Sequence, residues 1–373
     1  MQPIYLDYNA TTPIDPAVAA AMQPYILQHY GNPSSAHAYG HTTKEAVEQA
    51  RDQVASLLGC TAADVVFTSG GSEANNTVLK GVAHTYRHQG NHIITSAVEH
   101  PATINPCHFL AQQGVRVTYL PVDRTGMVDP EDVRQALTPQ TILISIMHAN
   151  NEVGTLQPIT EISRIARRHG VLLHTDAAQS VGKIPTLVDA LGVDFLSVAG
   201  HKVYAPKGVG ALYMRAGLAL EPLIHGAGHE SGRRAGTENV ICAVALGQAC
   251  AVAQSDLPRY QHEVRQLRDR FWQELEKRFS DRVVLNGHHE HRLPNTLHLN
   301  FRGVIGAELL EKLPGLAAST GSACHEGQVA LSPVLEAMGV TPELGMGAVR
   351  FSLGRYTTAQ EIEQAVGMIE AVF

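Results

Sequence analysis

The chain has 373 residues, 44% of them hydrophobic, which is enough to bury a substantial core and suggests two domains rather than one. Its 28 basic and 35 acidic residues give a formal net charge of −7. This balance, without any basic run interleaved with aromatics, argues against binding to nucleic acid or to anionic membranes as the main role.

The amino terminus shows neither the charged nor the apolar segment of a signal peptide, and no apolar stretch is long enough to cross a bilayer. We therefore expect a cytoplasmic protein without membrane contact. Five cysteines without a Cys-x-x-Cys pair suggest neither a disulfide framework nor a zinc knuckle. The histidine pair His84 and His88 lacks a third ligand, and the cluster His288–Arg292 has the composition of a solvated turn, so we expect no metal site.

Strand-like and helical patterns alternate through the first two thirds of the chain. Helical periodicity is present over residues 44–58 and 159–169, and seven short apolar runs predict strands. These runs are Val65–Thr68, His92–Ser96, Val115–Leu120, Thr141–Met147, Val171–Thr175, Phe195–Val198 and Gly210–Met214. The alternation predicts an α/β fold with a mostly parallel sheet that is covered by helices.

The pattern changes near residue 255. A long charged helix is expected over 260–279, followed by a strand over 296–301 and helices over 306–313 and 358–372. No internal repeat or flexible linker separates the two parts, so they are expected to pack together. We predict a large domain over residues 15–255 and a smaller α/β domain built from residues 1–14 and 256–373.

A glycine-rich turn follows the first predicted strand. The segment Ser69-Gly-Gly-Ser-Glu-Ala-Asn-Asn-Thr77 opens a helix, so free backbone N–H groups and the positive end of the helix dipole would face an anion there. The spacing matches neither the dinucleotide-binding nor the Walker fingerprint. Ser72 could donate to a phosphate oxygen; the alternative is an ordinary N-cap serine with Asn75 on the solvent side.

Two later strands lead into side chains of opposite charge, Asp176 and the lysine of Gly200-His-Lys202. Pyridoxal phosphate (PLP) needs a carboxylate that keeps its pyridine nitrogen protonated and a lysine that holds its aldehyde carbon, and neighbouring strand ends could supply both. In the alternative interpretation, both residues have only structural roles: Asp176 caps the following helix and Lys202 extends to solvent.

Cys324 lies in a segment of loop composition, Ala318–Gly327, which is rich in glycine and serine. The thiolate is the reactive form of cysteine, and the small polar neighbours favour a reactive thiol over a buried structural one. The other thiols in apolar helical contexts, Cys60, Cys242 and Cys250, are expected to be structural.

Motifs spread over nearly the whole chain resemble those of one enzyme family. They are Tyr5-Leu-Asp-Tyr-Asn-Ala-Thr-Thr-Pro13, Gly31-Asn-Pro-Ser-Ser35, Thr68-Ser-Gly-Gly-Ser-Glu73, Val98-Glu-His-Pro101, Asn150-Asn-Glu-Val-Gly154, His174-Thr-Asp176, Gly200-His-Lys202, Arg233-Arg-Ala-Gly-Thr-Glu-Asn239, Gly321-Ser-Ala-Cys324 and Arg350-Phe-Ser-Leu-Gly354. With them the chain resembles the cysteine desulfurases of the NifS/IscS type. These are PLP-dependent homodimers of fold type I, class V, that convert L-cysteine to L-alanine and a protein-bound persulfide.

The resemblance implies PLP fold type I, with a large domain built on a mostly parallel seven-stranded sheet and a smaller C-terminal α/β domain. It also implies which residues contact the cofactor. Lys202 would form the Schiff base, Asp176 would pair with the pyridinium nitrogen, Gln179 would bond the ring hydroxyl, and His100 would stack on the ring and shuttle protons. The phosphate would be held by Gly71, Ser72 and His201, with Thr237 reaching in from the other subunit.

The resemblance also implies how the substrate is handled. Arg350 would bind the substrate carboxylate as a bidentate pair, steadied by Asn151. The alternative is that Arg350 is a surface cation at the end of a strand, without a role in binding. Lys202 would remove the α-proton and Cys324 would attack the sulfur. Either His100 or His325 would take the proton of the cysteine.

One position departs from the family pattern. Many members have serine where this chain has Ala199, and the serine hydroxyl contacts the phosphate. A lost neutral hydrogen bond is worth on the order of 1 kcal/mol, so we expect weaker retention of the cofactor rather than an inactive enzyme.

Other functions stay open beside the desulfurase. A selenocysteine lyase or a cysteine or cystine lyase would use the same cofactor site without needing Cys324, and an aminotransferase would need a keto-acid acceptor. A non-catalytic scaffold partner is a further alternative. For the desulfurase, the sulfur would pass to an acceptor or scaffold protein that serves iron–sulfur clusters or other thio-cofactors.

Overall fold

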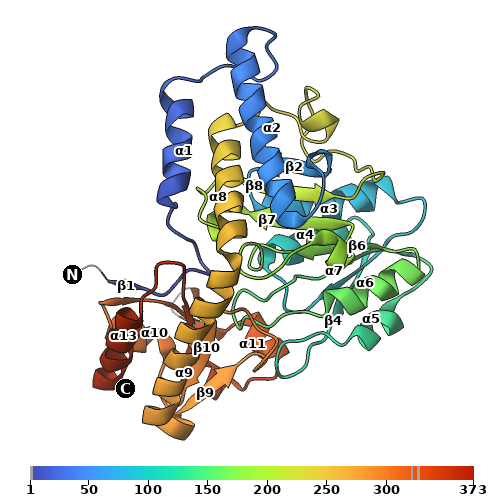
Figure 1. Ribbon diagram of the computed structural model, residues 1–373. Coiled ribbons are helices and arrows are strands. Elements are labelled where there is room, and N and C mark those ends of the chain that lie inside the picture. The colour runs from blue at the N-terminus through green and yellow to red at the C-terminus, as the bar shows by residue number, and fades with distance from the viewer. Residues whose placement is uncertain (1–2, 321, 326–327) are drawn as a thin grey trace.

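The computed structural model of the chain describes residues 3–320, 322–325 and 328–373, and between residues 321 and 330 it describes backbone only. Its largest element is a seven-stranded sheet in the order β2-β8-β7-β6-β5-β3-β4 (Figure 1). The strands are β2 (Val65–Thr68), β3 (His92–Ser96), β4 (Arg116–Leu120), β5 (Thr141–Ser145), β6 (Leu172–Asp176), β7 (Phe195–Ala199) and β8 (Gly210–Met214).

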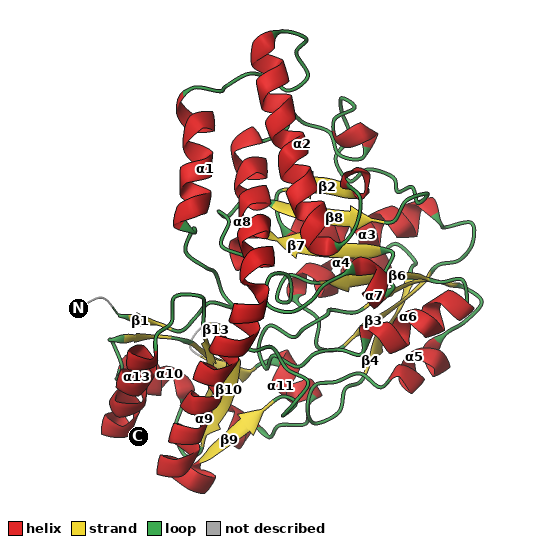
Figure 2. Cartoon of the chain, in the orientation of Figure 1, coloured by secondary structure: helices red, strands yellow, loops and turns green. Residues whose placement is uncertain are grey.

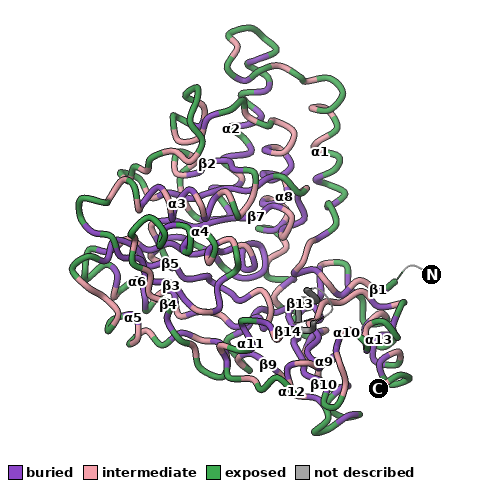
Figure 3. The backbone as a smooth tube through the Cα atoms, turned by 180° about the vertical axis from the view of Figure 1, so that it is seen from behind, coloured by how far each residue is buried: buried purple, intermediate pink, exposed green. Residues whose placement is uncertain are grey.

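Five neighbouring strands of this sheet, from β7 to β4, run parallel, and β8 is antiparallel to both of its neighbours. The parallel strands are joined through helices, which cover both faces and bury the side chains of the inner strands, whereas the edge strand β4 is partly exposed. The predicted α/β fold with a mostly parallel sheet is therefore confirmed. Figure 3 shows the strands as a buried band inside the molecule.

Alternating side chains of the strands enter two apolar clusters on opposite faces of the sheet. On β2, for example, Val65 belongs to one cluster and Val66 to the other. The first face is covered by α1 (Pro16–Leu27), α2 (Ala38–Leu58), α5 (Pro130–Ala136), α6 (Ile159–Arg168), α7 (Val188–Leu191) and α8 (Val240–Arg259). The second is covered by α3 (Gly71–Thr85) and α4 (Pro101–Ala111) (Figure 2).

A further apolar cluster surrounds a four-stranded antiparallel sheet in the order β12-β15-β10-β9. Its strands are β9 (Val283–Asn286), β10 (Thr296–Phe301), β12 (Ser319–Thr320) and β15 (Ala348–Ser352). The helices packed in this region are α9 (Arg265–Phe279), α10 (Gly306–Glu311) and α13 (Ala359–Val372). The amino-terminal strand β1 (Ile4–Tyr5) pairs with β11 (Leu316–Ala317), so the start of the chain lies beside its last third (Figure 1).

The remaining elements of this part include the hairpin of β13 (Ser322–His325) and β14 (Gln328–Leu331), then α11 (Pro333–Ala337) and α12 (Pro342–Gly345). The two sheets are bridged by a long helical rod, in which α8 continues through a π-helical turn at Tyr260–Val264 into α9. By length and composition alone, the helix Val240–Arg282 is the one described helix that could cross a membrane. Its apolar residues from Ala243 to Ala253 lie in the core beneath the central sheet, as in a core helix.

Candidate active site

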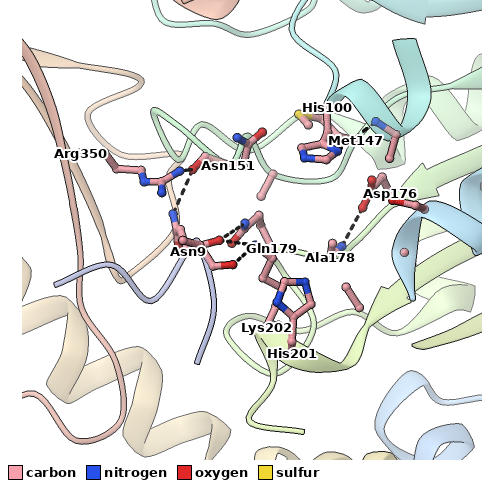
Figure 4. A pocket seen from close by; sticks show the side chains of 16 residues that line it. Asn9, His100, Met147, Asn151, Asp176, Ala178, Gln179, His201, Lys202 and Arg350 are labelled. Atoms are coloured by element: carbon pink, nitrogen blue, oxygen red, sulfur yellow. Dashed lines mark hydrogen bonds between the residues drawn. The ribbon is translucent and has the colours of Figure 1, made fainter. Parts of the chain in front are cut away.

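A cavity of about 410 Å³ opens at the carboxyl ends of β6 and β7. Such sheet edges are the usual ligand sites of open α/β folds. Its walls come from segments far apart in the sequence, and Figure 4 shows their side chains around the same space. The lining includes nine of the eleven predicted site residues: Gly71, Ser72, His100, Asn151, Asp176, Gln179, His201, Lys202 and Arg350.

Lys202 closes the short helical turn Gly200–Lys202 that follows β7. Its side chain is half-buried and faces the cavity, where Nζ donates to the carbonyl oxygens of Asn9 (2.5 Å) and Ala10 (2.7 Å). Burial, assisted by the guanidinium of Arg350, lowers the pKa of Lys202 to about 8, while Asp176 opposes the shift. A lysine with a lowered pKa has more of the unprotonated amine that forms imines.

Asp176 ends strand β6 with its carboxylate held on both oxygens. Oδ1 accepts from the backbone N–H of Ala178 (2.9 Å), and Oδ2 accepts from Nδ2 of Asn75 (2.7 Å). The aspartate therefore makes a turn contact and lines the cavity at the same time. Asn75 is fully buried in this arrangement, so the alternative with Asn75 on the solvent side is wrong.

The first turn of helix α3 faces the cavity with Gly71 and Ser72. Gly70 is the N-cap residue and no side chain caps the helix, so Ser72 is not the N-cap serine of the alternative interpretation. The uncapped N–H groups and the helix dipole favour an anion at this point. A Cβ on Gly71 would lie 3.4 Å from Cβ of Ala199, so the side chain at position 199 lies opposite this helix terminus.

Two histidines line the same cavity, and burial lowers the pKa of both rings. His100 is the N-cap residue of helix α4, and its Nδ1 accepts from the backbone N–H of Ala102 (3.0 Å). The neutral ring therefore carries its proton on Nε2. His201 lies within 3.2 Å of the hydroxyl of Thr11, and burial together with Lys202 lowers its pKa to about 4.

Arg350 lies within strand β15, paired with the neighbouring strands, and its side chain is 11% exposed, so it is not a surface cation. Its Nη1 donates to the carbonyl oxygen of Asn151 (2.9 Å), and its Nη2 donates to Oδ1 of Asp7 (2.8 Å). Its Nε is buried and has no hydrogen-bond partner among the described residues. A guanidinium with a free donor next to an amine and an open cavity is suited to receive a carboxylate.

Two of the predicted site residues are not among the described side chains that line the cavity. Thr237 is exposed in the loop before α8 and is not part of the lining. Cys324 belongs to β13, and its side chain lies outside the described part of the chain. The roles assigned to these two residues therefore stay predictions.

Sequence reasoning missed several residues that shape the site. Asn9 lines the cavity and accepts from Lys202, although its motif was recognised only as part of the family resemblance. Asn75 donates a hydrogen bond to Asp176, and Asp7 accepts one from Arg350. No local pattern marks these contacts, because the partners are separated by about a hundred residues or more.

Comparisons with known proteins agree with this geometry. The sequence model of the class-V aminotransferase family matches residues 4–365. A curated cysteine desulfurase IscS from Dictyoglomus turgidum is 48% identical over 371 residues, which cover 99% of this chain and 94% of the relative. Another, from an Anaeromyxobacter species, is 46% identical over 367 residues, covering 98% and 91%.

Solved structures show the same likeness. A structure described as a NifS-like protein superposes with a TM-score of 0.94 at 37% identity, covering 100% of this chain and 99% of its own. DndA from Streptomyces lividans superposes with a TM-score of 0.80 at 36% identity, covering 92% and 97%.

The chain belongs to the class-V aminotransferase family, and its fold is PLP fold type I. Within that family it is a PLP-dependent cysteine desulfurase, as the sequence motifs predicted. The residues present fit the cofactor, since a lysine, a carboxylate and an uncapped helix N-terminus converge on one cavity.

Proposed function

We propose that this cavity carries out cysteine desulfuration with the residues assigned by the family resemblance. Bound PLP supplies an aldehyde for the lysine and a protonated ring that withdraws electrons from the substrate. Lys202 is the attachment point, Asp176 holds the ring nitrogen, and Gln179 donates to the ring oxygen. Gly71, Ser72 and His201 hold the phosphate, completed by Thr237 of a second subunit.

In this proposal Nζ of Lys202 takes the α-proton of the substrate once the amine has been released. The lowered pKa supports that role, because a base with a pKa of about 8 is partly unprotonated near neutral pH. His100 would present its Nε2–H to a bound group as a hydrogen-bond donor. Accepting a proton on Nδ1 would cost it the bond to the N–H of Ala102.

Arg350 would bind the substrate carboxylate with Asn151 beside it. The carboxylate would replace Asp7 as the partner of the guanidinium or use the free Nε. Since both residues line the cavity together with Lys202, an α-amino acid bound there would present its α-carbon to the amine.

Cys324 is the proposed acceptor of the sulfur. The observation that carries this role is that the segment around it is attached at both ends beside the substrate site. Ser319 lies opposite Arg350 in the strand pairing, and Ser332 donates to the carboxylate of Glu152, the neighbour of Asn151. Cys324 is the fifth residue after Ser319, a span of up to about 17 Å, which allows the thiol to enter the cavity.

The thiolate of Cys324 would attack the substrate sulfur, so that an S–S bond forms while the carbon–sulfur bond breaks and alanine is left. His325 is the remaining candidate for taking the thiol proton, because His100 presents a donor. The persulfide would be handed to an acceptor or scaffold protein for iron–sulfur clusters or another thio-cofactor, in the cytoplasm.

Two features of the whole chain belong to the same proposal. The enzyme is a homodimer, which is supported by the position of Thr237 outside the cavity of its own chain. The large domain spans residues 15–255, and the small domain comprises 1–14 and 256–373, which agrees with the separate apolar clusters.

The change Arg350→Lys tests the substrate site. An ammonium cannot form the bidentate pair, so the KM for L-cysteine should rise about tenfold or more while the visible absorption of the bound cofactor stays unchanged. Arg302→Lys, an exposed arginine of the same sheet region, is the matched control and should leave KM unchanged. An unchanged KM in Arg350→Lys would contradict the role.

A further inference from the structure

Lys183 is a buried amine that the proposed mechanism does not use. It is 2% exposed and stands behind the cavity wall rather than in it. Burial, with the nearby cations Lys202 and Arg350, lowers its pKa well below the ordinary value for lysine. A buried lysine is costly, so its contacts indicate what it does there.

The turn after β6 brings this lysine beneath Gln179. The backbone N–H of Lys183 donates to the carbonyl oxygen of Ser180 (3.0 Å), so the lysine follows Gln179 by one tight turn. The turn requires Gly182, which has a φ of +74° and whose Cβ would lie 2.7 Å from Cγ2 of Val203. A side chain four residues after Gln179 therefore points back at it.

The Nζ of Lys183 donates to two amide oxygens, Oε1 of Gln179 (2.9 Å) and Oδ1 of Asn9 (3.2 Å). Both protonated and neutral amines carry at least two N–H donors, so these bonds do not depend on the charge. They are selective because the NH₂ end of an amide cannot accept them. The lysine thereby fixes which end of each amide is turned toward it.

The opposite end of Gln179 faces the cavity. Its Nε2 donates to the carbonyl oxygen of Asn9 (2.9 Å), the same oxygen that accepts from Lys202. One of the two Nε2 protons is used in this bond and the other is left for a group in the cavity. Without the amine, the amide of Gln179 would be free to turn its oxygen into the cavity.

Asn9 is fixed in the same way by its surroundings. Its Oδ1 also accepts from Nδ2 of Asn295 (2.9 Å), and its Nδ2 donates to Oγ1 of Thr296 (2.8 Å) and to the carbonyl oxygen of Asn151 (3.2 Å). The network thus joins the amino-terminal segment and the antiparallel sheet to the turn that carries Lys183. It holds the backbone of Asn9 where Lys202 and Gln179 meet it.

We propose that Lys183 is a positioning residue of the cofactor site, whose amine fixes the amides of Gln179 and Asn9 so that Nε2 of Gln179 donates into the cavity. This inference rests on the proposed contact between Gln179 and the oxygen on the cofactor ring. Lys183 itself touches neither cofactor nor substrate.

The test is the affinity of apoprotein for PLP, measured by absorbance titration, together with the pH midpoint of the visible band of the lysine-bound cofactor. Lys183→Met removes both donors at similar length and should weaken binding about five- to tenfold and move the midpoint. Lys44→Met removes an exposed cation on α2, outside the cavity lining, and should change neither quantity.

A double-mutant cycle with Gln179→Ala identifies the route of the effect. If Lys183 acts through Gln179, adding Lys183→Met to Gln179→Ala weakens binding by less than about twofold more. Should the single change at Lys183 leave both quantities as in the wild type while Gln179→Ala weakens binding, the inference is overturned and the role of Gln179 stands. If Gln179→Ala binds normally, the proposed contact of Gln179 is wrong and the inference falls with it.

If the methionine variant does not fold, Lys183→Gln tests whether the N–H donor at position 183 is what PLP binding requires. This variant keeps an N–H donor and should bind PLP within about twofold of the wild type. A loss as large as that of Gln179→Ala would overturn the inference.

Discussion

The carboxyl group of Glu99 lies fully buried directly before His100 in the chain. Its Oε1 accepts from Oγ of Ser96 (2.7 Å) and from the backbone N–H of Met147 (2.9 Å), whereas Oε2 has no partner in the described part of the chain. Burial raises the pKa of Glu99 to about 8, and the charge of Asp176 adds to the shift. The group is therefore protonated in the folded protein at neutral pH.

A raised pKa makes the stability of the apoprotein depend on pH. The folded state binds the proton of Glu99 more tightly than the unfolded state, so this contribution is complete below the ordinary glutamate pKa of 4.5 and is lost as the pH rises through about 8. Glu99→Gln should flatten the fall of the unfolding free energy between about pH 5 and about pH 9, measured by urea denaturation. Glu45→Gln, an exposed control, should follow the wild type; a wild-type-like curve for Glu99→Gln would contradict the assignment.

Ala199, where the sequence resemblance led us to expect serine, lines the cavity opposite Gly71. Ala199→Ser should restore one donor to an anion at this helix terminus. We expect PLP to bind up to about fivefold more tightly, equivalent to about 1 kcal/mol, in an absorbance titration of the apoprotein. Ala199→Cys has a similar size and a weaker donor, so it should change the affinity less; equal effects of the two changes would show that size matters rather than donation.

Residue identity could be predicted from the sequence only where chemistry requires a particular type. Lys202 and Asp176 were found because imine formation and a protonated ring need a lysine and a carboxylate at strand ends. Asn75, Asn9 and Lys183 were not found, because amides and lysines are common in any soluble chain. Only the fold brings them to the cavity wall.

At the level of elements, the turn Glu230–Gly232 is tied to two other parts of the large domain. The carboxylate of Glu230 accepts from Nη1 (2.6 Å) and Nη2 (2.9 Å) of Arg51 on α2, and from the backbone N–H of Phe67 on β2 (3.0 Å). Both charged side chains are less than a tenth exposed. The turn precedes the segment that carries Thr237, so this ion pair anchors the start of that segment to the large sheet.

Glu230→Gln should leave the buried guanidinium of Arg51 with only the half-exposed carboxylate of Glu48, 3.4 Å away, as a counter-charge. A broken buried pair of this kind costs about 3–5 kcal/mol in unfolding free energy, measured by urea denaturation. Glu131→Gln breaks an exposed pair with Arg134 and should change the stability little. If the two changes had the same small effect, the buried pair would not hold the turn.

The elements themselves were largely predictable. Three of the seven predicted strands have the observed bounds, because short apolar runs between turn residues leave little freedom. Helix α2 begins at Ala38, six residues before the predicted start, since the ring of His37 accepts from the N–H of Gly40 and caps the helix. Helix α8 was predicted only as a helical context around Cys242 and Cys250, without bounds, because its alanine-rich sequence is apolar on most sides and hides the helical period.

On the scale of the whole molecule, the site is assembled from both ends of the chain. The segment around Asn9, the strand that carries Arg350 and the turns after β6 and β7 meet only in the folded protein. Long-range meetings of this kind follow from topology and packing, which the order of elements does not determine. The family resemblance allowed these residues to be predicted as one site, and the structure shows the contacts that hold them together.

The most direct test of the account measures alanine, pyruvate and sulfide formed from L-cysteine with dithiothreitol, at matched PLP loading. Wild type should yield alanine and sulfide in equal amounts without pyruvate. Cys324→Ala should lose both products, whereas Cys242→Ala, a half-buried thiol at the start of α8, should behave as the wild type. Continued turnover of Cys324→Ala, or pyruvate in place of alanine, would contradict the persulfide mechanism and indicate a lyase.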